Sequence, residues 1–281
     1  MAIKTQLKSL LLISTLTASL TACNLTQTSL PAISDSGNKQ LGHIVWHDLV
    51  TPDLTKSQAF YGAVFDWQFQ PVNDSYVFVS NQGQTIAGFA ELDNNQNSSH
   101  WLALVSVNNV ENVIKQTRQS GGEVLVANTT IEGRGNIAVL SDPQGAVFSV
   151  IDTSNGDPNL NTADNSWIWQ EVWSDDPKAS QAFYQSLYSY NAAEKNVFGT
   201  NYSYIEVNNS PAIGFVKKPD AGIGNTWVNY IKVADVDATL LKVTAAGGLV
   251  LMAPSEKVRN GTVAIIRDPS GAGLVIQESM Q

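Results

Sequence analysis

An internal repeat constrains the fold of this chain more than any other feature of its sequence. Residues 46–61 (WHDLVTPDLTKSQAFY) align with residues 169–184 (WQEVWSDDPKASQAFY) at a constant offset of 123. Later the offset becomes 126, and the pairs are then Gly88-Phe89 with Gly214-Phe215, Trp101 with Trp227, and Asp142-Pro143-Gln144-Gly145 with Asp268-Pro269-Ser270-Gly271. Self-similarity at a fixed spacing indicates copies of one structural unit. We therefore expect two tandem domains of the same fold.

Each copy alternates short strands with two helices. HIVWHDLV predicts a strand, Asp53 or Thr55 can cap the helix that follows, and three short strands come next. The same order then recurs through WLALVSV, VENVIKQTRQSG and three final strands. The predicted fold class is α+β, with two βαβββ units in each copy. The first domain is expected at residues 41–153 and the second at 165–281, joined by a turn-rich linker.

The first 22 residues predict a signal peptide. Lys4 and Lys8 precede an apolar run that is too short to cross a bilayer as a helix. Leu20-Thr21-Ala22-Cys23 resembles the lipobox of bacterial lipoproteins. The resemblance implies that Cys23 is lipidated and carries acyl chains such as palmitate. An ordinary secretory signal is the alternative. Cys23 is the only cysteine, so no disulfide can form within the chain.

The segment after the lipobox predicts a tether to a membrane. Residues 23–40 are polar, with no apolar period, and favour a flexible linker. The residue after Cys23 is Asn24 rather than aspartate, which in enteric bacteria favours the outer membrane, facing the periplasm. Removal of residues 1–22 leaves 14 basic and 25 acidic residues, a net charge of −11. Such an acidic chain repels phosphate backbones, which argues against nucleic acid as a partner.

The repeated motifs resemble those of the vicinal oxygen chelate (VOC) superfamily, which contains glyoxalases, extradiol dioxygenases and bleomycin-resistance proteins. The similar features are the Phe-Tyr pair after a helix-capping aspartate, the Gly-Gly pair before a strand, and the DPxG turn before the last strand. The resemblance covers the chain from about Gly42 to Glu278. It implies that the paired βαβββ units of each domain form an incomplete barrel around a cleft that holds ligand and metal.

The metal-ligand positions that this resemblance implies do not carry metal ligands. Its metalloenzymes use histidine, glutamine or glutamate, whereas the matching positions here are Trp46, Leu102, Ser149, Trp169, Val228 and Val275. No cofactor is therefore favoured. A weaker alternative is a divalent-metal site of His47, His100 and Glu91 in the first domain, although strand alternation turns His47 away from Trp46.

The side chains expected to face the clefts are aromatic and acidic. Alternation places Trp46 with Asp48, and Trp169 with Glu171, on one face of each first strand. A carboxylate beside tryptophan could have a raised pKa or bind a small ligand. Further candidates for the lining of the cavities are Tyr76, Trp101, Tyr204, Trp227 and Tyr230. The alternative is that these aromatic residues fill the barrels.

These features predict a membrane-anchored lipoprotein of the cell envelope that binds a small molecule without a metal. One alternative is a divalent-metal lyase or dioxygenase that uses the first domain. Another is a structural or partner-binding lipoprotein with filled clefts. No nucleophile or phosphate-binding motif is present, and Gly133-Arg134-Gly135 is interpreted as a turn between strands.

Overall fold

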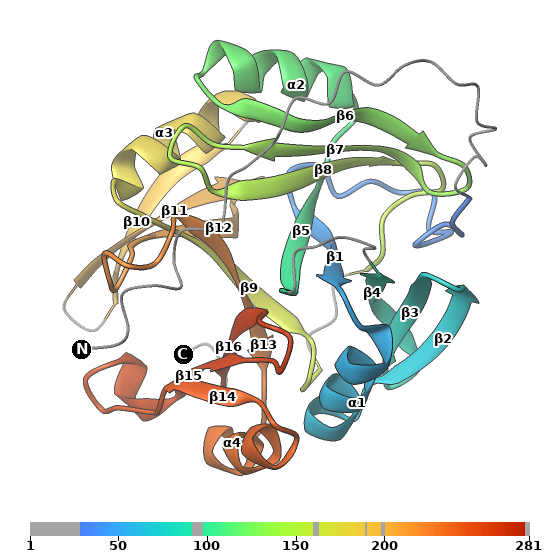
Figure 1. The fold of residues 1–281 in the computed structure, drawn as a ribbon. Helices are drawn as coiled ribbons and strands as arrows, with labels where there is room; N and C mark the ends of the chain where they lie inside the picture. Colours follow the sequence, from blue (N-terminus) through green and yellow to red (C-terminus); the bar gives the residue numbers. More distant parts are fainter. Residues whose placement is uncertain (1–28, 92–97, 160–162, 189, 198–199, 279–281) are drawn as a thin grey trace.

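The computed structural model describes residues 29–91, 98–159, 163–188, 190–197 and 200–278 (Figure 1). The first domain contains β1 (Ile44–Thr51), α1 (Leu54–Phe65), β2 (Gln68–Asn73), β3 (Tyr76–Asn81), β4 (Gln84–Glu91), β5 (His100–Ser106), α2 (Val110–Gln119), β6 (Glu123–Ile131), β7 (Gly135–Ser141) and β8 (Val147–Thr153). The second contains β9 (Trp167–Ser174), α3 (Pro177–Leu187), β10 (Asn191–Val197), β11 (Thr200–Val207), β12 (Ser210–Lys217), β13 (Thr226–Lys232), α4 (Val236–Ala245), β14 (Leu249–Met252), the short helix η1 (Arg259–Gly261), β15 (Val263–Arg267) and β16 (Gly273–Gln277).

Each domain has one eight-stranded mixed sheet. The strand orders are β2-β3-β4-β1-β5-β8-β7-β6 and β10-β11-β12-β9-β13-β16-β15-β14, which are the same order in the two repeats. The two βαβββ units of a domain meet where the first strands pair antiparallel, β1 with β5 and β9 with β13. Neither sheet closes on itself over the described residues. The predicted α+β class, the tandem repeat and the incomplete barrels are confirmed.

Local sequence explains where the helices begin. The side chain of Asp53 accepts a hydrogen bond from the backbone of Lys56, and Asp176 accepts two from the first turn of α3. A carboxylate at this position satisfies amide groups that have no partner within the helix. Of the two proposed caps, Asp53 fills this role, whereas Thr55 lies inside α1.

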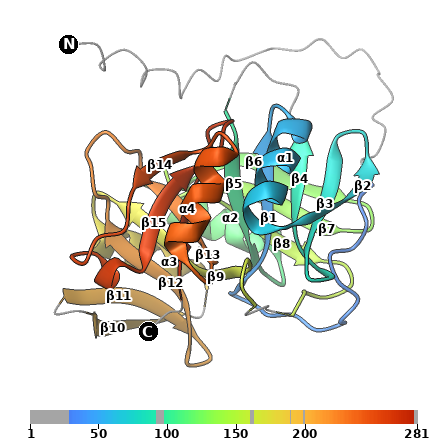
Figure 2. The same ribbon diagram turned by 90° about the horizontal axis from the view of Figure 1, so that it is seen from below.

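The two domains pack through their helix-bearing faces. Helix α1 contacts α4 and α2 contacts α3, and Figure 2 shows α1 beside α4. Two apolar cores each combine residues of both domains. The repeated motifs join them: the Tyr61 hydroxyl donates to Asp268 across the interface, and Tyr184 donates to Asp142. The shared tyrosine and DPxG aspartate therefore hold the domains together.

The N-terminal segment packs against the first domain, so the expectation of a free tether is wrong for residues 29–40. The backbone of Leu30 pairs with Glu132, and Gln40 donates to the carboxylate of Asp157. The side chain of Ile33 is buried in an apolar cluster with Val45, Trp46, Leu104 and Ile151. Burial of these apolar side chains offsets the chain entropy that the segment loses when it packs. The polar composition of the segment did not reveal this packing.

The predicted lipid attachment site and signal peptide lie outside the described residues. Within the part of the chain that the structure describes, no helix is both long and apolar enough to pass through a bilayer.

Candidate functional site

A buried polar cluster lies at the centre of the first-domain sheet, on the face away from the helices. We call Trp46, Asp48, Tyr76 and Arg134 the first-domain cluster. Asp48 Oδ1 accepts hydrogen bonds from the Trp46 indole at 2.9 Å and from the Tyr76 hydroxyl at 2.6 Å. Arg134 Nη1 donates to the same hydroxyl at 2.7 Å. A chain of hydrogen bonds therefore connects a guanidinium to a carboxylate through a tyrosine.

Arg134 is part of this cluster, so the interpretation of Gly133-Arg134-Gly135 as only a turn was incomplete. The turn is present, but the Arg134 side chain is 1% exposed. Its guanidinium carbon lies 5.5 Å from the Trp46 ring and 4.9 Å from the Tyr76 ring, and its Nε donates to the carbonyl of Pro31. The N-terminal segment thus covers the first-domain cluster.

The second domain holds an equivalent cluster, formed by Trp169, Glu171, Tyr202, Tyr230 and Arg259. Both oxygens of Glu171 are occupied. One accepts from the Tyr202 hydroxyl at 2.7 Å and from Arg259, and the other accepts from Tyr230 and from the indole of Trp173 at 2.8 Å. Arg259 lies over the rings of Tyr202 and Tyr230. Its side chain is 22% exposed, so this guanidinium is reachable from solvent.

The repeated Gly-Phe motif explains how the tyrosines reach the carboxylates. A side-chain carbon at Gly88 would lie 1.7 Å from the Tyr76 hydroxyl, and one at Gly214 would lie 1.8 Å from the Tyr202 hydroxyl. Such distances are far inside van der Waals contact. The glycines therefore leave the space in which each hydroxyl meets its carboxylate.

The electrostatics favour hydrogen-bond donors rather than a free base. Burial raises the pKa of Asp48, although the charge of Arg134 and the hydrogen bonds from Tyr76 and Trp46 oppose that rise. The pKa values of Tyr76, Tyr202 and Tyr230 are raised well above the ordinary tyrosine value. The larger cause is burial, and the smaller is the negative charge of the adjacent carboxylate. The phenols therefore stay protonated and serve the carboxylates as donors.

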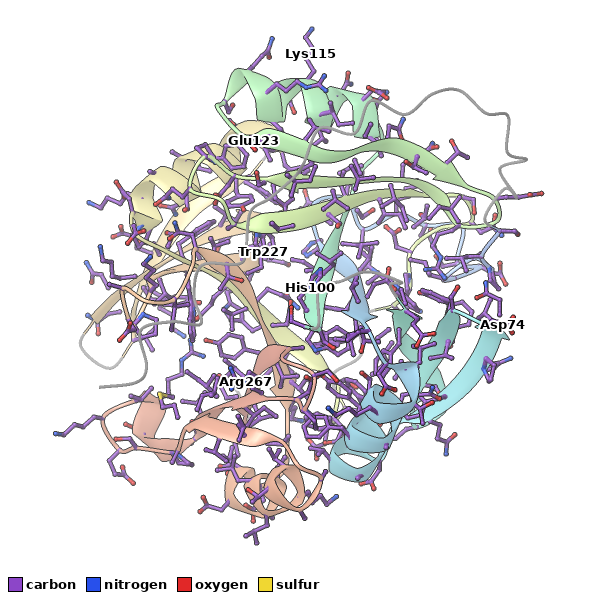
Figure 3. All side chains as sticks on the ribbon, in the orientation of Figure 1. Asp74, His100, Lys115, Glu123, Trp227 and Arg267 are labelled. Atoms are coloured by element: carbon purple, nitrogen blue, oxygen red, sulfur yellow. The ribbon has the colours of Figure 1, made fainter. Side chains whose placement is uncertain are left out.

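Of the other predicted lining residues, Tyr204 lies beside the second-domain cluster, whereas the two tryptophans lie elsewhere. Trp101 and Trp227 are on the helix-bearing faces, where their indoles donate to the Tyr61 and Tyr184 hydroxyls, and Figure 3 shows Trp227 in the middle of the molecule. Tyr204 is half-buried beside Tyr202, with the ring centroids 6.3 Å apart. The two tryptophans thus belong to the interdomain core. The prediction that they line the clefts failed because alternation from Trp46 and Trp169 does not fix the face of a different strand.

The residues present do not fit the metal that the fold family implies. His47 is buried on the opposite side of its strand from Trp46, where its ring stacks on Trp167. His100 and Glu91 are exposed, and Glu91 accepts from the backbone of Leu54. Within the described ranges, no three histidine, cysteine, aspartate or glutamate side chains gather as a metal would require.

Sequence reasoning missed three members of the clusters, Arg134, Arg259 and Tyr202. The offset of 126 that pairs Gly88 with Gly214 also pairs Tyr76 with Tyr202, so the repeat contained the signal for that tyrosine. The two arginines fall at offset 125, each in the connection that precedes a strand, and Arg134 lies between two glycines. Arginine in such a loop is usually solvated, and nothing local indicates that these two turn inward.

Comparison with known families agrees with the fold. Residues 44–151 match the model of the glyoxalase-like domain, and residues 171–276 match that of the glyoxalase/bleomycin resistance protein/dioxygenase superfamily. The two matches together cover most of the chain. The protein therefore belongs to the vicinal oxygen chelate superfamily, as a member with two tandem domains.

Similar proteins match over nearly their whole length. CFP32 of Mycobacterium tuberculosis (strain CDC 1551 / Oshkosh), named as a candidate glyoxylase, is 27% identical over 81% of this chain and 91% of its own. The anthracycline biosynthesis protein DauV of Streptomyces sp. (strain C5) is 26% identical over 84% and 93%. A Mn(II)-bound glyoxalase from Novosphingobium aromaticivorans superposes with a TM-score of 0.60 at 12% identity, over 86% of this chain and 83% of that one. This last likeness shows the fold alone.

Proposed function

We propose that this protein binds a small molecule without a metal, and that the ligand contacts the second-domain cluster. The observation that carries the proposal is the guanidinium in each cluster. Arg134 and Arg259 place a fixed positive charge near Asp48 and Glu171, the carboxylates at the centres of the two sheets. A charge supplied by the chain itself needs no metal to balance Asp48 or Glu171.

The two clusters differ in how far their arginines are exposed to solvent. The N-terminal segment covers Arg134, whereas Arg259 is partly exposed. Arg259 already uses Nη1 and Nη2 to hold Gln277 and Glu171, so its position is fixed before any ligand arrives. A guanidinium presents planar donors that suit carboxylate and carbonyl oxygens. The ligand class that fits is a small molecule with acceptor oxygens, packed against tyrosine and tryptophan rings.

The test is a ligand screen with a matched pair of variants. Aromatic acids, dicarbonyls and, because a relative is named for anthracycline biosynthesis, an anthracycline would be titrated while tryptophan fluorescence is recorded. Arg259→Met should weaken binding of a hit at least about tenfold, since a charged hydrogen bond contributes roughly 1.5–3 kcal/mol. Arg118→Met, on the exposed face of α2, should bind as the wild type does.

Two outcomes would overturn this assignment. One is binding that survives Arg259→Met but disappears in Arg134→Met, which would move the ligand to the first domain. The other is a screen without any fluorescence change, which would favour filled clefts and a protein partner. A thermal melt of Arg259→Met would show whether its loss of binding reflects unfolding, and Arg259→Lys, which keeps a positive charge beside Glu171, is the conservative comparison.

Metal independence gives a second expectation. The purified protein should contain no stoichiometric Zn, Fe, Mn or Ni, and a chelator should leave its melting temperature unchanged, because a bound metal would add RT ln(1 + [L]/Kd) to stability. Elemental analysis together with a melt in chelator checks both points. One equivalent of metal that is lost on His47→Ala, His100→Ala or Glu91→Gln would instead support a metal-dependent lyase or dioxygenase.

We also propose that Cys23 anchors the protein in the cell envelope. The support is the lipobox sequence and its position after a short apolar run. In a bacterial host, Cys23→Ser should abolish labelling by a radioactive fatty acid and move the protein from the membrane fraction to the soluble fraction or to an unprocessed precursor. Label that persists in the variant would refute lipidation at this position.

A further inference from the structure

A cavity of about 220 Å³ lies between the two domains. Of the residues in the two polar clusters, only Trp169 reaches its wall. Its walls come from the starts of β1, β4, β9 and β12 and from the linker at Pro158 and Asn159. An engineered protein cavity of about 150 Å³ binds benzene, so this space is large enough for a molecule with one aromatic ring. Domain interfaces are common places for such sites.

The cavity lies on the local twofold axis that relates the repeats. His47 and Gln170 occupy the same repeat position, 123 residues apart, and the Gln170 amide nitrogen meets His47 Nε2 at 3.1 Å. Equivalent residues touch only where a twofold axis passes between them. Ile86 and Ala212, which are equivalent at offset 126, also line the cavity. The smaller side chain at Ala212 leaves one wall less filled than its counterpart.

Two rings have fixed positions at the wall. The Trp167 indole donates to the carbonyl of Ile86 at 3.1 Å, and its ring stacks on His47 with the centroids 3.9 Å apart. The half-buried ring of His43 also lines the cavity. A stacked indole and imidazole offer an aromatic guest flat surfaces, and imidazole nitrogens accept or donate a hydrogen bond.

No charged side chain is among the described residues that line the cavity. Burial lowers the pKa of His43, and burial lowers the pKa of His47 to about 3, so both rings are neutral at pH 7. A charged guest would lose its hydration without gaining an ion pair. The lining therefore selects against ions, in contrast with the second-domain cluster, where Arg259 favours acceptor oxygens.

From the position, size and uncharged lining of this cavity, we propose that it is a second ligand site, which takes a neutral single-ring aromatic molecule with a hydroxyl or N–H group. Phenol is a suitable probe, and benzoate is its charged counterpart of similar size. By isothermal titration at pH 7, phenol should bind the wild-type protein with a Kd on the order of 0.1–1 mM, as seven heavy atoms allow. Benzoate should bind this site at least about tenfold more weakly.

Variants then locate the site. Ala212→Ile copies the larger residue of the first repeat into the cavity, and Gln84→Trp adds an indole at its exposed rim; each should weaken phenol binding at least about tenfold. Gln70→Trp makes the same change at an exposed position of β2, outside the lining, and should leave binding unchanged. Arg259→Met should also leave it unchanged, which separates this site from the second-domain cluster.

Several results would overturn the proposal. They are absence of phenol binding to the wild type, equal binding of benzoate at this site, or phenol binding that Ala212→Ile and Gln84→Trp do not reduce. Thermal melts of the variants in the absence of phenol would show that each is folded before its binding is measured.

Discussion

Replacement of Asp48 by leucine is expected to lower the free energy of unfolding by about 3–5 kcal/mol, because it leaves the buried Arg134 guanidinium without a nearby negative charge. The Tyr76 hydroxyl would lose its acceptor in the same step. Because the two domains share their apolar cores and should unfold as one unit of roughly 240 residues, the fall in melting temperature is roughly 6–20 °C. Thermal and urea unfolding, followed by circular dichroism, measure it.

The double variant Asp48→Leu/Arg134→Met distinguishes a buried charge from a simple loss of packing. With both charges removed, apolar groups of similar size fill the space, and stability should return to within about 1–2 kcal/mol of the wild type. Asp152→Leu is the control, because Asp152 pairs with Lys39 at the surface and such pairs contribute about 0–1 kcal/mol. If the double variant is as unstable as Asp48→Leu, the charge of Arg134 is not the cause.

The repeat made most of the fold predictable from sequence. Two segments that align at offset 123 must adopt the same structure, and alternation within β1 and β9 placed Trp46 with Asp48 and Trp169 with Glu171. In the structure these pairs belong to the centres of the two clusters. The family resemblance pointed to the two tryptophan positions, and alternation then predicted that Asp48 and Glu171 share a face with them.

Long-range packing explains what the sequence did not reveal. Arg134 reaches its partners from a loop, and its burial depends on the N-terminal segment that covers it. Trp101 contacts Tyr61, which in turn contacts Asp268 of the other domain. Neither contact follows a local period, because each depends on how separate elements dock. The polar N-terminal segment likewise gave no periodic signal, although Ile33 is buried there.

Acid is expected to destabilise the protein through His47. Its pKa is about 3 in the folded chain, lowered by burial and only partly raised by Asn229, whereas an unfolded histidine has a pKa of 6.5. The folded state therefore binds fewer protons, so this contribution to stability is complete above pH 6.5 and is lost as the pH falls towards 3. At 1.36 kcal/mol per pKa unit, the loss is about 2 kcal/mol at pH 5 and approaches about 5 kcal/mol near pH 3.

The variant His47→Gln isolates this effect, since the second repeat carries glutamine at the equivalent position, Gln170. Glutamine gives up the stacking on Trp167, so the variant should be less stable at pH 7, but it has no proton to gain. Urea unfolding at pH 7, 6, 5 and 4 should show a free energy that falls less steeply in the variant, by about 2 kcal/mol between pH 7 and 5. Burial also lowers the pKa of His100, so His100→Gln should change the slope in the same direction, but less, because this side chain is exposed. Equal slopes for the wild type and His47→Gln would show that His47 is protonated in the folded state in mild acid. Because His47 lines the cavity between the domains, the wall of that cavity would then be charged rather than neutral.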